Sequence, residues 1–305
     1  MTLTHEHVIH RISNQSQNPD NTCVDTRLAA EELVFFRDAG GSAVCDVTPI
    51  GVGRDPLALQ EVSRLSGVHV VSGLGLYEFS VWPESLRRMS AAELSDFLVR
   101  EAEGARGDIP AGLLGEVSSH NEAHHAEWRR YRLSEEEKAV FRAVAQAQQR
   151  SGLAVSTHAS LGRAGVAQLR CLIDAGADPE RVVIGHCDAQ THEDIALDLD
   201  YYHAIWREGA YLQFDLFGWE QLAPDERRFQ RVAALVREGA ADRVLLSTDT
   251  CRRSQLRRYG GRGFDYLFAR VLPGLRRAGV PDSAICRMTI ANPARILARS
   301  PRADT

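Results

Sequence analysis

Two rhythms of apolar and polar positions recur along this chain. Short and almost wholly apolar runs, typical of strands buried on both faces, are each followed by a longer stretch in which apolar residues return at helical spacing. The predicted strands cover residues 3–7, 42–47, 68–74, 112–116, 153–158, 182–186, 209–215 and 244–249. The predicted helices cover residues 25–40, 55–67, 91–104, 134–151, 165–175, 200–207, 225–238 and 283–298.

The predicted helix starts carry the residues that helix termini favour. Asp55 and Pro56 form an N-cap with proline at the first helical position, and residues 134–137 (SEEE) have capping-box form. No linker or low-complexity segment interrupts the alternation of strands with helices. The pattern therefore predicts an α/β fold, a closed parallel (β/α)8 TIM barrel that occupies residues 1–305 as a single domain.

Composition narrows the class of protein. A chain of 305 residues that is 44% hydrophobic can bury one large core, and its formal net charge of −5 argues against a nucleic-acid or membrane-surface partner. No apolar run is long enough to span a membrane. The six cysteines lie far apart without a C-x-x-C pair, which favours reduced thiols in a cytoplasmic protein. We expect a small-molecule substrate, with a homodimer as one assembly to test.

Residues that can bind a metal ion follow the apolar runs. His5 and His7 are two positions apart on a short extended segment, so their side chains point to the same side. Later runs end in residues of the same kind, namely Glu116, His158, His186 and Asp249. Because the carboxyl ends of all strands open onto one face of a parallel barrel, we expect these side chains to meet there. Six ligands suit two divalent metal ions that share a bridging carboxylate.

Each of these histidines, taken alone, is better explained as a hydrogen-bonded core residue. Their recurrence at the ends of different strands favours the metal site instead. The other histidines end no predicted strand, and we expect them to be solvated: His10, His69, His120, His124, His125, His192 and His203. Asp188 follows His186 by two positions and is expected either to orient that ring or to cap the next segment.

The chain resembles the phosphotriesterase family of the amidohydrolase superfamily, and the resemblance runs almost end to end. The motifs that carry it are TLTHEH at 2–7, AGLLGEVS at 111–118, VSTH at 155–158, RVVIGHCD at 181–188, LLSTDTCRRS at 245–254, YGG at 259–261 and ANP at 291–293. The resemblance implies a more buried metal on His5, His7 and Asp249, a more exposed metal on His158 and His186, and Glu116 as the bridge. Zinc is the expected metal, with manganese, cobalt and iron as alternatives.

The sequence departs from many family members at the bridging position. Those members use a carboxylated lysine on the fourth strand, whereas this chain has Glu116 there and its single lysine is Lys138, within a predicted helix. The chain is therefore similar to the glutamate-bridged branch of the family, and fast phosphotriester hydrolysis is not expected.

The expected reaction is hydrolysis. Two cations lower the pKa of a bridging water, and the hydroxide that results attacks the substrate. Asp249 is the predicted catalytic residue, which orients the hydroxide and passes its proton to the leaving group. An ester or lactone bond of a small anionic molecule is the first expectation, with the amide bond of an N-acyl amino acid-like substrate and a phosphoester as alternatives. A metal-bound barrel that binds a ligand without turnover is the non-enzyme alternative.

Three residues are predicted to contact the substrate. Tyr77 and Trp219 lie in loops on the open face and are expected to line the pocket, although a packing role suits them equally. Arg252 lies three residues beyond Asp249, and its planar guanidinium suits a carboxylate or phosphate. Relatives that act on phosphorylated sugar lactones pair an arginine here with a tyrosine three residues on. Gln255 holds that position in this chain, so a carboxylate is favoured over a phosphate.

Overall fold

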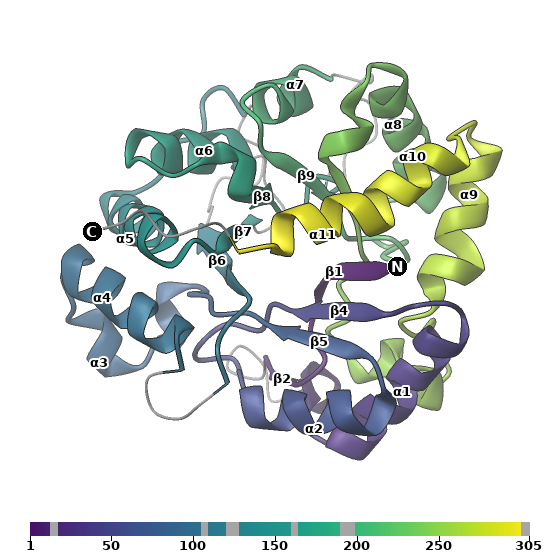
Figure 1. Ribbon diagram of the computed structural model, residues 1–305, viewed down its shortest axis with the longest axis horizontal. Helices are drawn as coiled ribbons and strands as arrows, with labels where there is room; N and C mark the ends of the chain where they lie inside the picture. Colours follow the sequence, from purple (N-terminus) through teal and green to yellow (C-terminus); the bar gives the residue numbers. More distant parts are fainter. Residues whose placement is uncertain (13–17, 105–108, 120–127, 160–163, 190–198, 300–305) are drawn as a thin grey trace.

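Parallel strands form a barrel that is ringed by helices in this computed structural model, which describes residues 1–12, 18–104, 109–119, 128–159, 164–189 and 199–299 (Figure 1). The barrel strands are β1 (Thr2–Glu6), β4 (Ala43–Asp46), β5 (His69–Ser72), β6 (Leu113–Ser119), β7 (Ala154–Ala159), β8 (Val182–Ile184), β9 (Tyr211–Phe214) and β10 (Val244–Leu246). The short strands β2 (His10–Arg11) and β3 (Thr22–Cys23) pair antiparallel outside the barrel.

The helices follow the strands in the order that the sequence predicts. They are α1 (Thr26–Asp38), α2 (Pro56–Ser66), α3 (Glu84–Arg87), α4 (Ala91–Ala102), α5 (Glu135–Ser151), α6 (Gly165–Asp174), α7 (Asp200–Trp206), α8 (Asp225–Arg237), α9 (Leu272–Arg277), α10 (Asp282–Cys286) and α11 (Asn292–Leu297). The predicted caps are present: the side chain of Asp55 accepts the N–H of Ala58, and Ser134 and Glu137 form a capping box.

Parallel pairing orders the strands as β1-β4-β5 and β6-β7-β8-β9-β10. Between β5 and β6 the barrel closes through isolated β-bridges from Gly73 to Leu113 and from Leu76 to Val117. Between β10 and β1 it closes where the N–H of Asp249 donates to the carbonyl of His5 at 3.3 Å. These contacts confirm the predicted barrel and bring all strand ends to one rim.

Glu6 joins β1 to the segment after β10. Its buried carboxylate accepts the hydroxyl of Ser247 at 2.7 Å, the hydroxyl and N–H of Thr248 at 2.8 and 2.7 Å, and the N–H of Thr250 at 2.7 Å. Charged acceptors make the strong hydrogen bonds, so a fully buried carboxylate is tolerated here. The contacts fix the loop that carries Asp249.

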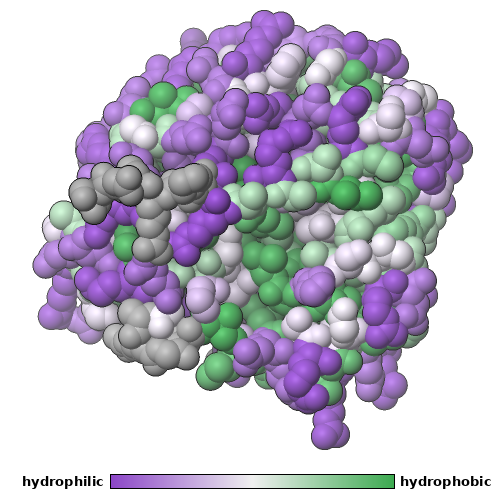
Figure 2. All heavy atoms as spheres, in the orientation of Figure 1, coloured by the Kyte–Doolittle hydropathy of each residue, from purple (hydrophilic) through white to green (hydrophobic). Residues whose placement is uncertain are grey.

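Helix α11 covers the opposite end of the barrel. Asn292 at its start donates to the carbonyls of Ala241 and Val244, where β10 begins, and Ile296 packs on the first residues of β7 and β8. Figure 1 looks onto this end, with α11 crossing in front of the strands, and Figure 2 shows apolar side chains gathered in a hollow beside it. The amino-terminal end of the barrel is therefore closed by a helix and apolar side chains, and the metal-binding residues lie at the opposite end.

The structure contains the short elements β2, β3 and α3, which the sequence did not predict, and it differs from the predicted elements in further places. Strand β6 continues to Ser119, so Glu116 lies inside a strand rather than at its end. The predicted last helix consists of α10, a π-helical turn over Arg287–Ala291 and α11 in succession. Helix α9 was not predicted, because the sequence pattern was not assigned between residues 249 and 283. Among the described residues, no helix is long and apolar enough to cross a membrane.

Candidate metal centre

Glu116 lies at the centre of a cluster of histidines at the carboxyl-terminal rim. Its Oε1 atom is 3.3 Å from Nε2 of His5 and 3.3 Å from Nε2 of His186, and it also contacts Nδ1 of His158. Its Oε2 atom faces Nε2 of His7 at 3.8 Å. The two oxygens of one carboxylate thus face different histidines, which is the arrangement that a bridging ligand requires.

Asp249 completes the cluster on the side of β1. Its Oδ1 atom lies 3.4 Å from Nε2 of His7 and 3.8 Å from Nε2 of His5. On the other side, Nε2 of His186 lies 2.8 Å from Nδ1 of His158. The structure therefore brings all six predicted ligands together, although they come from five different strands or strand ends.

The backbone is left-handed at two of these residues, with φ of 51° at His186 and 46° at Asp249. This conformation is uncommon without glycine and costs about 1–3 kcal/mol for each residue, so the surrounding structure must hold it. The N–H of His186 donates to Oδ2 of Asp215 at 3.1 Å, and that of Asp249 donates to the carbonyl of His5. Both turns aim a side chain inward immediately after a short strand.

Asp215, which follows β9, is a further residue of the cluster that the sequence prediction missed. Its Oδ1 atom is 2.8 Å from Nδ1 of His186, and its Oδ2 atom is 3.3 Å from Nδ1 of His5. A carboxylate on the far nitrogen fixes the ring and raises its basicity as a metal ligand. The signal was present, because Asp215 is an acidic residue at the end of a predicted strand, like the others.

Burial and neighbouring charges shift the pKa values of the side chains in the cluster. Burial lowers the pKa of His5, but the carboxylates of Asp215 and Glu116 outweigh burial and raise it to about 9. Burial prevails at His7, whose pKa falls to about 3. Burial raises the pKa of Asp249 to about 7 despite the nearby histidines. At Glu116, the histidines outweigh burial and hold the pKa well below its usual value. The carboxylates of the cluster thus favour positive charge on a neighbouring group.

The donor atoms fit divalent metal ions. His5, His7 and Glu116 offer donor atoms within 4.8 Å of one another, and Glu116, His158 and His186 form a second such group, so the two groups share Glu116. Nε2 of His5 and Oδ1 of Asp249 are buried without a hydrogen-bond partner among the described residues. Imidazole and carboxylate donors suit zinc, manganese, cobalt or iron. Buried donors left without partners are what metal ligation would satisfy.

A cavity of about 380 Å³ opens over this cluster. Tyr77 lines it, and its hydroxyl lies 3.3 Å from Nε2 of His158. Trp82, in the same loop, donates from its indole to the carbonyl of Tyr77 at 2.8 Å and thereby supports that loop from behind. The cavity is large enough for a small molecule only.

The other predicted substrate residues also line the cavity. The indole of Trp219 donates to the carbonyl of Thr248 at 3.1 Å, and the exposed guanidinium of Arg252 lies 4.9 Å above the Trp219 ring. Gln255, the residue in place of a tyrosine, accepts the N–H groups of Cys251 and Arg252 at 2.9 Å each. Gln255 thus shapes the backbone turn that presents Arg252.

Two minor predictions are resolved. His10 was expected to be solvated, but it is buried, and its Nδ1 atom lies 2.8 Å from the carbonyl of His7, so that prediction was wrong. Asp188 has the capping role: it accepts the N–H groups of Asp215 and Leu216, which follow β9, while Asp215 orients His186. The predictions for His120, His124, His125 and His192 lie outside the described residues.

Comparison with known proteins supports the same family as the motifs. A family model described as the phosphotriesterase family matches residues 1–297. The chain is 33% identical over 300 residues to the N-acetyltaurine hydrolase of Danio rerio, covering 92% of this chain and 82% of that protein. It is 32% identical over 294 residues to the phosphotriesterase homology protein of Escherichia coli (strain K12), covering 96% of each.

Solved structures agree. A crystal structure of the Escherichia coli phosphotriesterase homology protein, complexed with phosphate in its active site, superposes with a TM-score of 0.88 at 32% identity, covering 97% of this chain and 98% of that chain. Relatives named as hydrolases match most of the chain, so this protein is a metal-dependent hydrolase, as predicted. With the family model, the sequence relatives and the barrel in agreement, the chain belongs to the phosphotriesterase family.

Proposed function

We propose that this protein hydrolyses an amide or ester bond in a small anionic molecule, using two divalent metal ions. The observation that carries the proposal is the central position of Glu116: its Oε1 atom faces His5, His158 and His186, and its Oε2 atom faces His7. His5, His7 and Asp249 would hold one ion, His158 and His186 the other, and Glu116 both. We propose zinc first, with manganese, cobalt and iron as alternatives. When bound, such a pair supplies a water of lowered pKa and polarises the oxygen of the bond to be cleaved.

Asp249 would move the proton. A carboxylate beside the attacking water can accept its proton and return that proton to the leaving group. Its Oδ1 atom faces His5 and His7, and it also lines the cavity. We propose that Asp249 takes the proton of the attacking water and delivers it to the leaving group.

The lining of the cavity supports a short substrate with one anionic end. Tyr77 and Trp219 would enclose the body of the substrate, because both line the cavity beside the cluster. Arg252 would bind the anion, since it lines the cavity and its exposed guanidinium lies over the Trp219 ring. A planar guanidinium binds carboxylates and sulfonates through paired N–H groups.

The amide is the first candidate for the bond. Several relatives more than 30% identical to this chain are named N-acetyltaurine hydrolases, and that name describes the amide of an anionic amine. This support moves the amide ahead of the ester or lactone, which the sequence had placed first. A barrel that only binds a ligand is set aside, because curated relatives that match most of the chain are named hydrolases.

The experiment is a panel of matched substrates with zinc- or manganese-loaded protein. N-acetyltaurine and N-acetylglycine carry an anion, whereas N-acetylethanolamine is a neutral analogue. A γ-lactone and 4-nitrophenyl phosphate represent the other bonds. We expect the highest kcat/KM on an anionic amide. Turnover of the phosphoester alone, or equal turnover of anionic and neutral amides, would contradict the proposal.

Arg252→Gln tests the anion site on the best anionic amide and on its neutral analogue. Losing one charge-assisted contact costs about 1.5–3 kcal/mol, which lowers kcat/KM by roughly 10- to 150-fold on the anionic substrate only. Arg253→Gln is the matched control, because the neighbouring Arg253 contacts Tyr259 and does not line the cavity. Equal losses on both substrates would remove Arg252 from anion recognition.

A further inference from the structure

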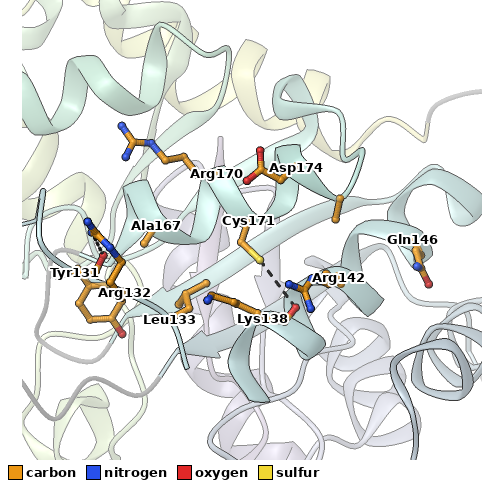
Figure 3. A pocket seen from close by; sticks show the side chains of 11 residues that line it. Tyr131, Arg132, Leu133, Lys138, Arg142, Gln146, Ala167, Arg170, Cys171 and Asp174 are labelled. Carbon is orange, nitrogen blue, oxygen red and sulfur yellow. Dashed lines mark hydrogen bonds between the residues drawn. The ribbon is translucent and has the colours of Figure 1, made fainter. Parts of the chain in front are cut away.

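A second hollow lies on the outside of the barrel, between α5 and α6. This groove, called here the α5–α6 groove, has a volume of about 770 Å³ and so exceeds the cavity over the metal cluster. Figure 3 shows its walls: Lys138 and Arg142 come from α5, Arg170 and Cys171 from α6, and Arg132 from the segment before α5. None of these residues belongs to the proposed active site.

The groove gathers positive charge on an acidic protein. Four of its lining residues are cationic, namely Arg132, Lys138, Arg142 and Arg170, and Asp174 is the single acidic residue among the described lining. The whole chain, by contrast, has a formal net charge of −5. A concave surface lined by one sign of charge concentrates ions of the opposite sign.

Two of the cations have guanidinium groups without a partner among the described residues. Lys138 pairs with Glu135 at 2.6 Å, and Arg132 donates to the carbonyls of Arg129 and Tyr131. Within the described part of the chain, no ion pair or hydrogen bond involves the side chain of Arg142 or Arg170. Both are exposed and available to a ligand.

The floor of the groove is apolar. Tyr131 and Leu133 are buried there, Ala167 lies on the α6 side, and Cys171 is half-buried with its thiol donating to the carbonyl of Lys138. Burial raises the pKa of this thiol, so it contributes a neutral surface. An apolar floor under unpaired cations suits a ligand that has an apolar body and several anionic groups.

We propose that the α5–α6 groove is a second, non-catalytic binding site for a small polyanion that carries two or more phosphate or sulfonate groups. Arg142 and Arg170 bind the anionic groups from opposite helices, and Arg132 and Lys138 supply further positive charge. The proposal is independent of the bond that the metal centre cleaves.

The probe is 8-hydroxypyrene-1,3,6-trisulfonate, followed by fluorescence anisotropy on the metal-loaded protein. Pyrene-1-sulfonate serves as the matched probe, with the same ring and one anionic group. We expect the trisulfonate to bind at least about tenfold more tightly, and its affinity to fall with added salt. Equal affinities for the two probes would show that the ring alone is recognised and would overturn the proposal.

Amino-acid substitutions test whether the probe binds in the α5–α6 groove. Arg142→Gln/Arg170→Gln is expected to weaken trisulfonate binding at least about tenfold, whereas Arg27→Gln/Arg237→Gln, which removes two exposed arginines from α1 and α8, is expected to leave it unchanged. Circular dichroism melting confirms that each variant is folded. Arg252→Gln is expected to retain binding. Loss of binding in Arg252→Gln, or retention in Arg142→Gln/Arg170→Gln, would overturn the proposal.

Competition distinguishes a small molecule from an acidic protein segment. We expect fructose 1,6-bisphosphate to displace the trisulfonate at a lower concentration than decaglutamate does. The reverse order would indicate a protein partner and overturn the assignment to a small ligand.

Discussion

At the scale of single residues, the centre depends on a few carboxylates with different environments. Glu116 is surrounded by histidines that keep it ionised, while burial raises the pKa of Asp249 to about 7. Glu116 is proposed as a ligand alone, whereas Asp249 is proposed both as a ligand and as the proton carrier.

Asp249→Asn should separate these tasks. The amide keeps the shape of the side chain and its Glu6-supported loop, but it cannot take a proton. We expect kcat to fall by roughly 10²–10⁴-fold, with an unchanged circular dichroism spectrum. A rate near that of the wild type would exclude Asp249 from proton transfer.

Asp215→Asn should act through the rings that it contacts. The amide loses the charge that faces Nδ1 of His186 and of His5, so these rings become weaker ligands. We expect the affinity for zinc to fall by about 10- to 100-fold, measured by competition with a chelator. Asp242→Asn, an exposed position on the other end of β10, is the control. Unchanged zinc affinity in Asp215→Asn would show that the contact has no effect on ligation.

Residue types and spacing alone predicted His5, His7, Glu116, His158, His186 and Asp249 as a group that meets at one rim. They did not predict Asp215. An acidic residue after a strand can orient a histidine or accept backbone N–H groups, and the sequence does not distinguish the two until the partner is known. Asp188 illustrates the ambiguity: it lies nearer to His186 in sequence, yet it caps backbone N–H groups instead.

At the scale of elements, the contact between β1 and β10 closes the barrel. Glu6 receives four hydrogen bonds from residues 247–250, and β1 itself has only five residues. The alternation of apolar and helical stretches predicted both strands. It could not predict that Glu6 joins them, since this contact spans more than 240 positions.

Glu6→Gln tests that closure. The amide turns one acceptor into a donor that faces an N–H or hydroxyl, which leaves a buried donor without a partner at a cost of about 1–3 kcal/mol. We expect the Tm of the metal-free protein to fall by roughly 2–10 °C. Glu61→Gln, on the exposed face of α2, should leave the Tm unchanged. If both variants melted like the wild type, Glu6 would not stabilise the closed barrel.

The limits of sequence patterns also appear at this scale. Strand β6 runs past Glu116 because its pairing with β7 shifts register between Leu114 and Val117, an irregularity that periodicity does not reveal. Helix α9 has the sequence LPGLRR, and its proline and glycine are poor helix formers, so composition does not predict it. The bounds of the π-helical turn before α11 are likewise not marked in the sequence.

At the scale of the whole molecule, one end of the barrel stabilises the fold and the other carries the candidate metal centre. Helix α11 and apolar side chains close the amino-terminal end, and the polar cluster lies at the other end beneath its cavity. A parallel barrel is what makes ligands from positions 5 to 249 neighbours, so the fold prediction and the site prediction depended on each other.

The most direct test of the account is the metal content of the wild type and of Glu116→Ala, with hydrolysis of the best amide substrate measured on the same samples. Protein is loaded with zinc, desalted and subjected to elemental analysis, with Glu61→Ala as the exposed control. The account predicts two zinc ions per chain and full activity in the wild type and the control, and loss of both metal and activity in Glu116→Ala. Fewer than two ions in the active wild type, or two ions with full activity in Glu116→Ala, would contradict a binuclear centre bridged by Glu116.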